Sequence, residues 1–340
     1  MSYEFLQILW FVLIAVLWIG FFFLEGFDFG VGMLLPFLGK KDVERRSIIN
    51  AVGPTWDGNE VWLLTAGGAT FAAFPHWYAT MFSGFYLALF LLLIGLIIRG
   101  ISFEYRSKDA SPKWRNTFDW MIAVGSFLCA LLLGTAFANL ARGVPIDANK
   151  MFTGNLFTLL NPYGLLGGLT TVAIFLLHGA NFLSLKLDGK LHERVAKLTQ
   201  KLWVVATVLY LGLGVFTYIT GFYARNKIDP GIAPIAAVAF LLASGYLITQ
   251  KREGWAFVMV GLNIVFTQIT FFLMIFPNVM ISTIDPAFSL TIYNASSSHY
   301  TLTVMSVIAL IFVPIVLAYQ GWTYYMFRKR ISNDKKNLVY

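Results

Sequence analysis

Cysteine and charge are both scarce in this 340-residue chain, and each scarcity excludes a class of protein. A single cysteine, Cys129, excludes an internal disulfide framework and any thiolate metal site built by this chain alone. Only 12% of the residues are charged, whereas about a quarter are charged in an ordinary soluble domain. The formal charge of +8 lies in short basic clusters without a continuous patch, which argues against a nucleic-acid partner.

Histidine is rare as well, with four residues, and no two of them stand at the i, i+4 spacing of a metal-binding helix. Only His178 lies well inside an apolar segment. A lone intramembrane histidine can ligate haem iron, but a structural hydrogen bond is the favoured interpretation. The residues alone therefore predict no metal site and no cofactor ligand in this chain.

Long apolar runs dominate the chain instead: 58% of its residues are hydrophobic and its mean hydropathy is +0.71. A helix needs about 20 apolar residues to cross a bilayer. Nine segments meet this requirement, at residues 5–35, 51–74, 77–98, 118–139, 163–187, 202–223, 232–249, 255–276 and 301–327. The connections between them are too short to build a soluble core. We therefore predict an all-α, polytopic integral membrane protein that forms a single transmembrane domain over residues 1–340.

Lysine and arginine are distributed very unequally between the two sides of these segments. The connections after the first, third, fifth and seventh segments and the C-terminal tail hold 21 of the 25 basic residues. The remaining four are Arg142, Lys150, Arg225 and Lys227. Because basic residues are retained on the cytoplasmic side, the N-terminus is predicted outside and the C-terminus in the cytoplasm.

Two pairs of carboxylates stand in this apolar sequence, Glu25 with Asp28 and Asp57 with Glu60. A charge at membrane depth costs roughly 2.5–3.5 kcal/mol, so such residues usually mark function. Each pair is three residues apart, which places both acids on one helical face, and the predicted topology puts both pairs in the cytoplasmic half. Arg99 is expected at the same level as their counter-charge. Like charges this close favour shared protonation, so the pattern predicts a proton relay, with structural hydrogen bonding between helices as the alternative.

Other features of the apolar segments have simpler interpretations. Glycines beside both acid pairs predict close helix packing; they are Gly26, Gly30, Gly32, Gly58, Gly67 and Gly68. Asp119 is expected as a helix-start charge at the membrane interface. A further group of polar side chains predicts interhelical hydrogen bonds or, alternatively, contact with a lipid or quinone headgroup; it comprises Asn181, Asn263, Thr267, Gln268 and Thr270.

Several motifs carry a resemblance to a known family. They include Gly26-Phe27-Asp28-Phe29-Gly30, Trp56-Asp57-Gly58-Asn59-Glu60-Val61-Trp62, Tyr105-Arg106-Ser107-Lys108, Thr153-Gly154-Asn155 and Leu160-Asn161-Pro162. In this combination, over essentially the whole chain, the sequence resembles subunit II of the bacterial cytochrome bd-type quinol oxidases. The resemblance implies a multi-pass protein of the bacterial cytoplasmic membrane.

The resemblance also implies an activity and partners. The family's enzyme oxidises quinol at the outer face and reduces dioxygen to water with protons from the cytoplasm, without evidence here for pumping. Subunit I is expected to hold the menaquinol or ubiquinol site and three haems, two of b type and one of d type, and this chain none. A small single-helix accessory subunit and membrane lipids are further expected partners. The resemblance leaves open the route of dioxygen and whether this chain binds a structural lipoquinone.

The family's proton path runs partly through subunit II. By motif, its acids correspond to Asp57 and Asp28, with Arg99 and Glu104 near the entrance. Glu25 matches a position that is also acidic in relatives, whereas Glu60 matches one that can be Gln and is the weaker candidate. We expect no catalytic residue in this chain. Two other functions stay open from the residues alone: a proton- or cation-coupled secondary transporter and a purely structural assembly subunit.

Overall fold

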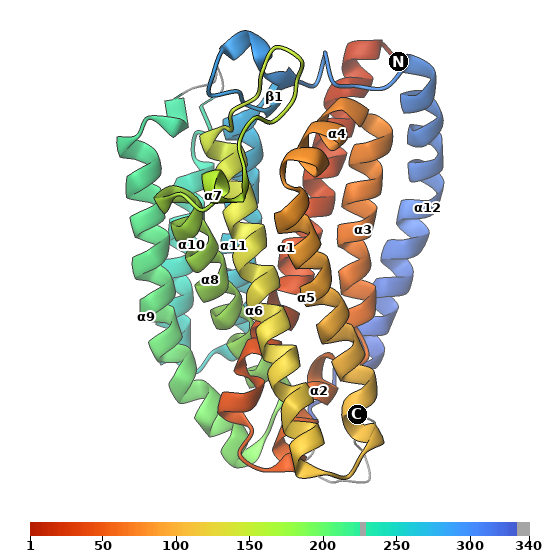
Figure 1. The fold of residues 1–340 in the computed structure, drawn as a ribbon. Coiled ribbons are helices and arrows are strands. Elements are labelled where there is room, and N and C mark those ends of the chain that lie inside the picture. Colours follow the sequence, from red (N-terminus) through yellow and green to blue (C-terminus); the bar gives the residue numbers. More distant parts are fainter. Residues whose placement is uncertain (225–228, 332–340) are drawn as a thin grey trace.

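The computed structural model describes residues 1–224 and 229–331, which form a bundle of long helices along one common axis (Figure 1). The α-helices are α1 (Tyr3–Leu38), α2 (Asp42–Val52), α3 (Trp56–Ala73), α4 (Pro75–Gly84), α5 (Tyr86–Tyr105), α6 (Pro112–Arg142), α7 (Leu156–Leu159), α8 (Pro162–Lys186), α9 (Gly189–Ile219), α10 (Ala233–Thr249), α11 (Glu253–Ile275) and α12 (His299–Met326). The remaining elements are the 3-10 helices η1 (Arg106–Lys108), η2 (Phe222–Ala224) and η3 (Pro286–Phe288) and the strands β1 (Asn278–Met280) and β2 (Leu290–Thr291).

Seven helices among the described residues are long and apolar enough to cross a membrane: α1, α5 extended by η1, α6, α8, α9, α11 and α12. The helical membrane fold predicted from the apolar runs is therefore confirmed. Two further helices, α3 with 18 residues and α10 with 17, run along the same axis.

Helix α1 is central and packs on α3, α6, α8 and α11. At its crossing with α8 the two backbones nearly touch. A Cβ atom on Gly30 would lie 1.9 Å from the carbonyl oxygen of Phe175, and one on Gly179 would lie 2.5 Å from the amide nitrogen of Val31. The close packing predicted for Gly30 is thus confirmed, because only a residue without a side chain fits there.

The glycines of α3 do not serve this purpose within the chain. A Cβ atom added at Gly58, Gly67 or Gly68 would meet no atom within 4 Å. The prediction of close packing was wrong for these three positions as far as contacts inside this chain are concerned. Gly58 and Gly68 are exposed and Gly67 is partly exposed, so no other helix in the described part of the chain packs on them.

The second and third predicted segments are interrupted, which the sequence analysis missed. The segment 51–74 does not begin as one helix at residue 51: α2 ends at Val52 and α3 begins at Trp56. Pro54 lacks the N–H that would continue α2. The segment 77–98 is broken at Phe85, between α4 and α5. There Gly84 leaves room for Phe152, whose Cβ would lie 2.6 Å from a Cβ added at residue 84.

The basic connections meet at one end of the bundle, which we call the basic end. There Arg106 of η1 pairs with Asp42 of α2 at 3.0 Å, and the amide of Ile331 donates to the carbonyl of Lys186 at 2.8 Å. His192 of α9 pairs with Glu253 of α11 at 2.5 Å. Four basic residues used in the sequence-based prediction of orientation lie outside the described residues: Arg225, Lys227, Lys335 and Lys336.

The opposite end carries the antiparallel pair β1 and β2, which lies in the predicted connection after α11 (Figure 1). The same connection reaches the starts of other helices: the amide of Ser297 donates to the carbonyl of Ala73, and Tyr3 donates to the carbonyl of Ser297 at 2.7 Å. Helices α1 and α12 thus start side by side at this end and run to the basic end.

Candidate functional site

Arg99 of α5 is fully buried and is the centre of the intramembrane charges. Its guanidinium forms ion pairs with Glu25 of α1, also fully buried, and with Glu60 of α3, whose Oε2 lies 3.1 Å from Nη1. The rings of Phe29 and Phe103 flank the same group at 4.8 Å and 5.3 Å. The counter-charge expected for the acids is present, and the cation is held in a site built from three helices and apolar rings.

Asp28 lies one turn after Glu25 on α1 and is also fully buried. Its Oδ2 accepts a hydrogen bond from Nδ2 of Asn59 at 2.7 Å. Asn59 in turn accepts at Oδ1 from the hydroxyl of Tyr324 at 2.8 Å and from Nε2 of Gln320 at 3.3 Å. Asp28 therefore belongs to a hydrogen-bond network that joins α1, α3 and α12.

The remaining predicted residues lie apart from this buried group. Asp57 is exposed on α3, next to Gly58, and Glu104 is exposed near the end of α5. Glu60 is intermediate, with 22% of its side chain exposed. The structure thus brings together Glu25, Glu60 and Arg99, with Asp28 beside them, but it does not bring Asp57 and Glu104 into the same cluster. These two acids face away from the protein's own interior.

Sequence reasoning missed the partners of Asp28. Asn59 was part of a quoted motif but received no role, and Gln320 and Tyr324 were not considered. One signal was present: two polar side chains stand at i, i+4 on one face of an otherwise apolar helix. Which residue they contact depends on how α12 packs against α3, and periodicity does not contain that information.

Asp119 was expected as an interfacial helix-start charge, and this expectation was wrong. Helix α6 begins at Pro112, seven residues earlier, and Asp119 is fully buried. It accepts from Arg106 at 2.5 Å and from Arg45 at 2.8 Å. Together with Asp42, which is exposed and also pairs with Arg106, these residues form an ionic cluster that ties α2 to η1 and α6.

His178 of α8 uses one of its ring nitrogens in a hydrogen bond to the backbone. Its Nε2 lies 3.1 Å from the carbonyl oxygen of Phe23, and its ring stacks on Phe257 with centroids 4.6 Å apart. The structural hydrogen bond favoured for this residue is confirmed. Among the described residues, no group of three or more histidine, cysteine, aspartate and glutamate side chains is placed to hold a metal ion.

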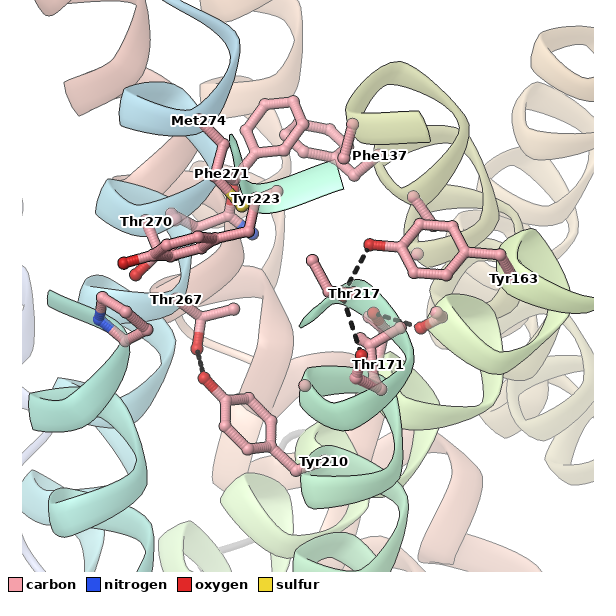
Figure 2. Close-up of a pocket in the computed structure, with 18 of the residues that line it drawn as sticks. Phe137, Tyr163, Thr171, Tyr210, Thr217, Tyr223, Thr267, Thr270, Phe271 and Met274 are labelled. Carbon is pink, nitrogen blue, oxygen red and sulfur yellow. Dashed lines mark hydrogen bonds between the residues drawn. The ribbon is translucent and has the colours of Figure 1, made fainter. Parts of the chain in front are cut away.

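A separate cavity of 560 Å³ lies between α6, α8, α9, α10 and α11 (Figure 2). Its wall is mainly apolar. Two hydrogen-bonded pairs line it, Tyr163 with Thr217 at 2.9 Å and Tyr210 with Thr267 at 2.6 Å. Gln268 also lines it and has a buried Oε1 with no hydrogen-bond partner in the described part of the chain. This is the combination expected of a site for a largely apolar molecule with a polar head.

Comparison with known proteins identifies the family. Residues 6–327 match the family model described as cytochrome bd terminal oxidase subunit II. The chain belongs to the cytochrome bd terminal oxidase subunit II family. Subunit 2 of the cytochrome bd ubiquinol oxidase of Bacillus subtilis (strain 168) is 44% identical over 329 residues, covering 96% of this chain and 97% of the relative. Subunit 2 of the cytochrome bd-I ubiquinol oxidase of Escherichia coli (strain K12) is 39% identical over 367 residues, covering 98% and 97%.

The fold agrees with this membership in the cytochrome bd family. A chain in the structure of the bd oxidase from Geobacillus thermodenitrificans superposes with a TM-score of 0.78 at 16% identity, covering 95% of this chain and 98% of that one. The protein is therefore a subunit of a respiratory terminal oxidase, an oxidoreductase complex of the bacterial membrane that contains haem and a subunit I.

Proposed function

We propose that this subunit supplies part of the path by which protons from the cytoplasm reach the site of dioxygen reduction to water. The observation that carries the proposal is the buried group formed by Arg99, Glu25 and Asp28, with Glu60 at its edge. One arginine faces three carboxylates here, so it cannot neutralise all of them. Acids in this position bind and release protons.

Two exposed acids, Asp57 and Glu104, extend the proposed proton path from the buried group to the surface of this subunit. Asp57 and Glu60 lie one turn apart on α3, and Glu60 contacts Arg99 while Asp57 faces away from the bundle. A face of α3 with exposed glycines beside Asp57 suits close approach by another helix, so we place subunit I against it. Glu104, exposed on α5, lies toward the basic end and serves the entrance.

Replacement of Asp57 by Asn tests this path. We expect the assembled oxidase to retain its haem content, because Asn has nearly the same size and shape as Asp, and to lose most of its quinol-dependent oxygen consumption. General acid–base groups typically contribute about 10²–10⁴-fold to a rate, so a loss of at least tenfold is expected. Glu4→Gln is the matched control. It also removes an exposed carboxylate, but at the start of α1, which lies at the end of the bundle opposite the basic end. Full turnover of haem-replete Asp57→Asn enzyme would exclude the role, and loss of haem would indicate a structural residue.

The membrane topology that goes with this function has nine crossings within one transmembrane domain over residues 1–340. Helices α3 and α10 complete the set with the seven long helices. The convergence of the basic connections at one end supports an N-terminus outside and a C-terminus in the cytoplasm. This orientation places Arg99 and the basic end on the side from which protons enter.

We further propose the composition of the rest of the complex, which membership in the family supports. Subunit I holds two b-type haems and one d-type haem and binds the quinol, either ubiquinol, as in the names of the relatives, or menaquinol. A small single-helix subunit completes the assembly. Helix α12 supports such partners, because Leu302 is its one buried residue and the rest of it faces outward or lies in part at the surface.

A second candidate function is the binding of a structural lipoquinone in the 560 Å³ cavity of Figure 2. The unpartnered Oε1 of Gln268 is an acceptor, so it favours a headgroup that can donate, such as the hydroxyl of the reduced, quinol form, and the apolar wall favours an isoprenoid tail.

Filling the cavity tests this second function. Gly214→Leu inserts a side chain into it, whereas Gly212→Leu, on the same helix, adds one at an exposed position outside it. Quinone extracted from the purified complex is expected to fall by one molecule per complex for Gly214→Leu and to stay unchanged for Gly212→Leu. Equal quinone content in the two variants would contradict the assignment.

A further inference from the structure

The orientation of the Asn59 amide is determined by residues far from it in the sequence. The indole N–H of Trp62 is a donor only, and it donates to Oε1 of Gln320 at 2.9 Å. Gln320 must therefore turn its Nε2 toward Asn59, where it donates to Oδ1 at 3.3 Å. The hydroxyl of Tyr324 donates to the same oxygen at 2.8 Å. With two donors at Oδ1, the amide of Asn59 can present only its N–H groups to Asp28.

This chain of hydrogen bonds has one direction. It starts at Trp62, passes through Gln320 and Asn59, and ends at Oδ2 of Asp28. Because Oδ2 already accepts an N–H, a proton taken up by Asp28 is favoured on its other oxygen, Oδ1. Asn59 and Asp28 are both fully buried, so bulk water does not reach these positions.

Tyr324 also faces the basic end. It lines a cavity of 210 Å³ together with Asn50, Thr55, Lys186 and Lys329. Thr55 is buried, whereas Lys329 is exposed, so the cavity extends from the surface at the basic end into the protein. The hydroxyl that orients Asn59 therefore lies between this cavity and Asp28.

We propose that Gln320 and Tyr324 of α12 are positioning residues for proton uptake. They hold the amide of Asn59 in the orientation in which its N–H, and not its oxygen, faces Asp28. The proposal rests on the proposed function, in which Asp28 carries protons. Without both donors the amide is free to rotate by 180° and to present its oxygen to Asp28. An acceptor beside the carboxyl favours its protonated form and withholds the proton from the path.

The experiment uses the complete oxidase complex with Tyr324→Phe, Gln320→Leu and the double variant. Tyr325→Phe is the matched control, because Tyr325 is the adjacent residue and is 60% exposed. Each single variant keeps one donor to Asn59, so the double variant is expected to lose the most quinol-dependent oxygen consumption. A hydrogen bond to a charged group corresponds to about a tenfold change, which is the loss expected for the double variant at full haem content. If the double variant does not assemble, the two single variants are measured against Tyr325→Phe by the same criteria.

An infrared difference spectrum supplies a readout that a merely structural role would not change. The carboxyl band of Asp28 is identified as the redox-induced band that disappears in Asp28→Asn. This band is expected to shift most in the double variant, less in each single variant, and to stay in place in Tyr325→Phe. An unshifted band in the double variant, or its full turnover, would overturn the positioning role.

The proton-carrying role of Asp28 and the positioning role of Gln320 and Tyr324 can be refuted separately. If Asp28→Asn keeps full turnover, the proton-carrying function of Asp28 is wrong, and the positioning proposal that rests on it falls as well. If Asp28→Asn is slow while the double variant is fast and its band is unshifted, the proposed function stands and only the role of Gln320 and Tyr324 is refuted.

Discussion

At the scale of single residues, one buried arginine of α5, Arg99, pairs with acids from two other helices, Glu25 of α1 and Glu60 of α3. Glu25, Asp28 and Arg99 stand out because an ionised group costs free energy in an apolar segment. Their partners are set by packing: Arg99 lies between α1 and α3, and Asp28 meets a residue of α3 that is held by α12. Asp57 and Glu60 are indistinguishable by spacing, yet one is exposed and the other contacts Arg99. Only the rotation of α3 about its axis decides this.

The buried ion pair leads to a prediction for Arg99→Met. This change leaves Glu25 buried without a counter-charge, and breaking a buried pair in this way costs about 3–5 kcal/mol. We expect a strong loss of assembled, haem-containing complex, measured by the visible spectrum of the purified membrane protein. Adding Glu25→Gln and Glu60→Gln to Arg99→Met removes the unpaired charges and is expected to restore assembly without restoring turnover. Arg252→Met, at an exposed arginine, is the control. Normal assembly of Arg99→Met alone would show that Glu25 is not held as a charge.

At the scale of elements, apolar length predicts where helices cross the membrane but not where they break. The run at 5–35 is found as α1, which continues through Pro36 to Leu38. The runs at 51–74 and 77–98 contain breaks at Pro54 and Phe85. Hydropathy averages over such short interruptions, and beside the break at Phe85 the chain packs on the distant Phe152.

The turn between α1 and α2 provides a pH-dependent prediction. Glu44 of α2 accepts from the amides of Lys40 and Lys41 at 2.8 Å and 3.1 Å and pairs with Arg194 of α9. Partial burial raises the pKa of Glu44, but the hydrogen bonds from Arg194 and the two amides outweigh it, so that its pKa is lowered. A carboxyl with a lowered pKa stabilises the folded state above its unfolded pKa of about 4.3, and this contribution disappears as the pH falls through the folded value.

Glu44→Gln is therefore expected to lower the thermal stability of the complex at pH 7. Its difference from the wild type is expected to shrink as the pH falls below about 4.3, where the wild-type carboxyl also becomes neutral. Thermal unfolding of the purified complex over a series of pH values measures both effects, with Glu4→Gln as a control at an exposed acid. A destabilisation that is equal at all pH values would assign the role of Glu44 to shape instead of charge.

At the scale of the whole molecule, the distribution of lysine and arginine predicts an arrangement that contacts in the structure support. Connections that are far apart in the sequence meet at the basic end, where Arg106, Asp42, His192 and Glu253 form ion pairs between them. The opposite end is joined by different contacts, such as the hydrogen bond from Thr80 to the carbonyl of Lys150 at 2.8 Å. Charge counting does not reveal which charged side chains near the membrane surface are buried. Asp119 and Arg106, for example, are both buried and pair with each other.

The single cysteine makes the orientation directly measurable. Cys129 is fully buried, so the wild-type chain is expected to give little reaction with a thiol reagent that does not cross membranes. Ala148→Cys adds an exposed thiol at the end opposite the basic end, and Ser107→Cys adds one at the basic end. In intact cells we expect labelling of Ala148→Cys only, because position 148 lies outside and position 107 in the cytoplasm. Ser107→Cys is expected to react once the membrane is permeabilised, which controls for its exposure. The reverse pattern would invert the topology and place Arg99 and its acids on the outer side, where they could not take up protons from the cytoplasm.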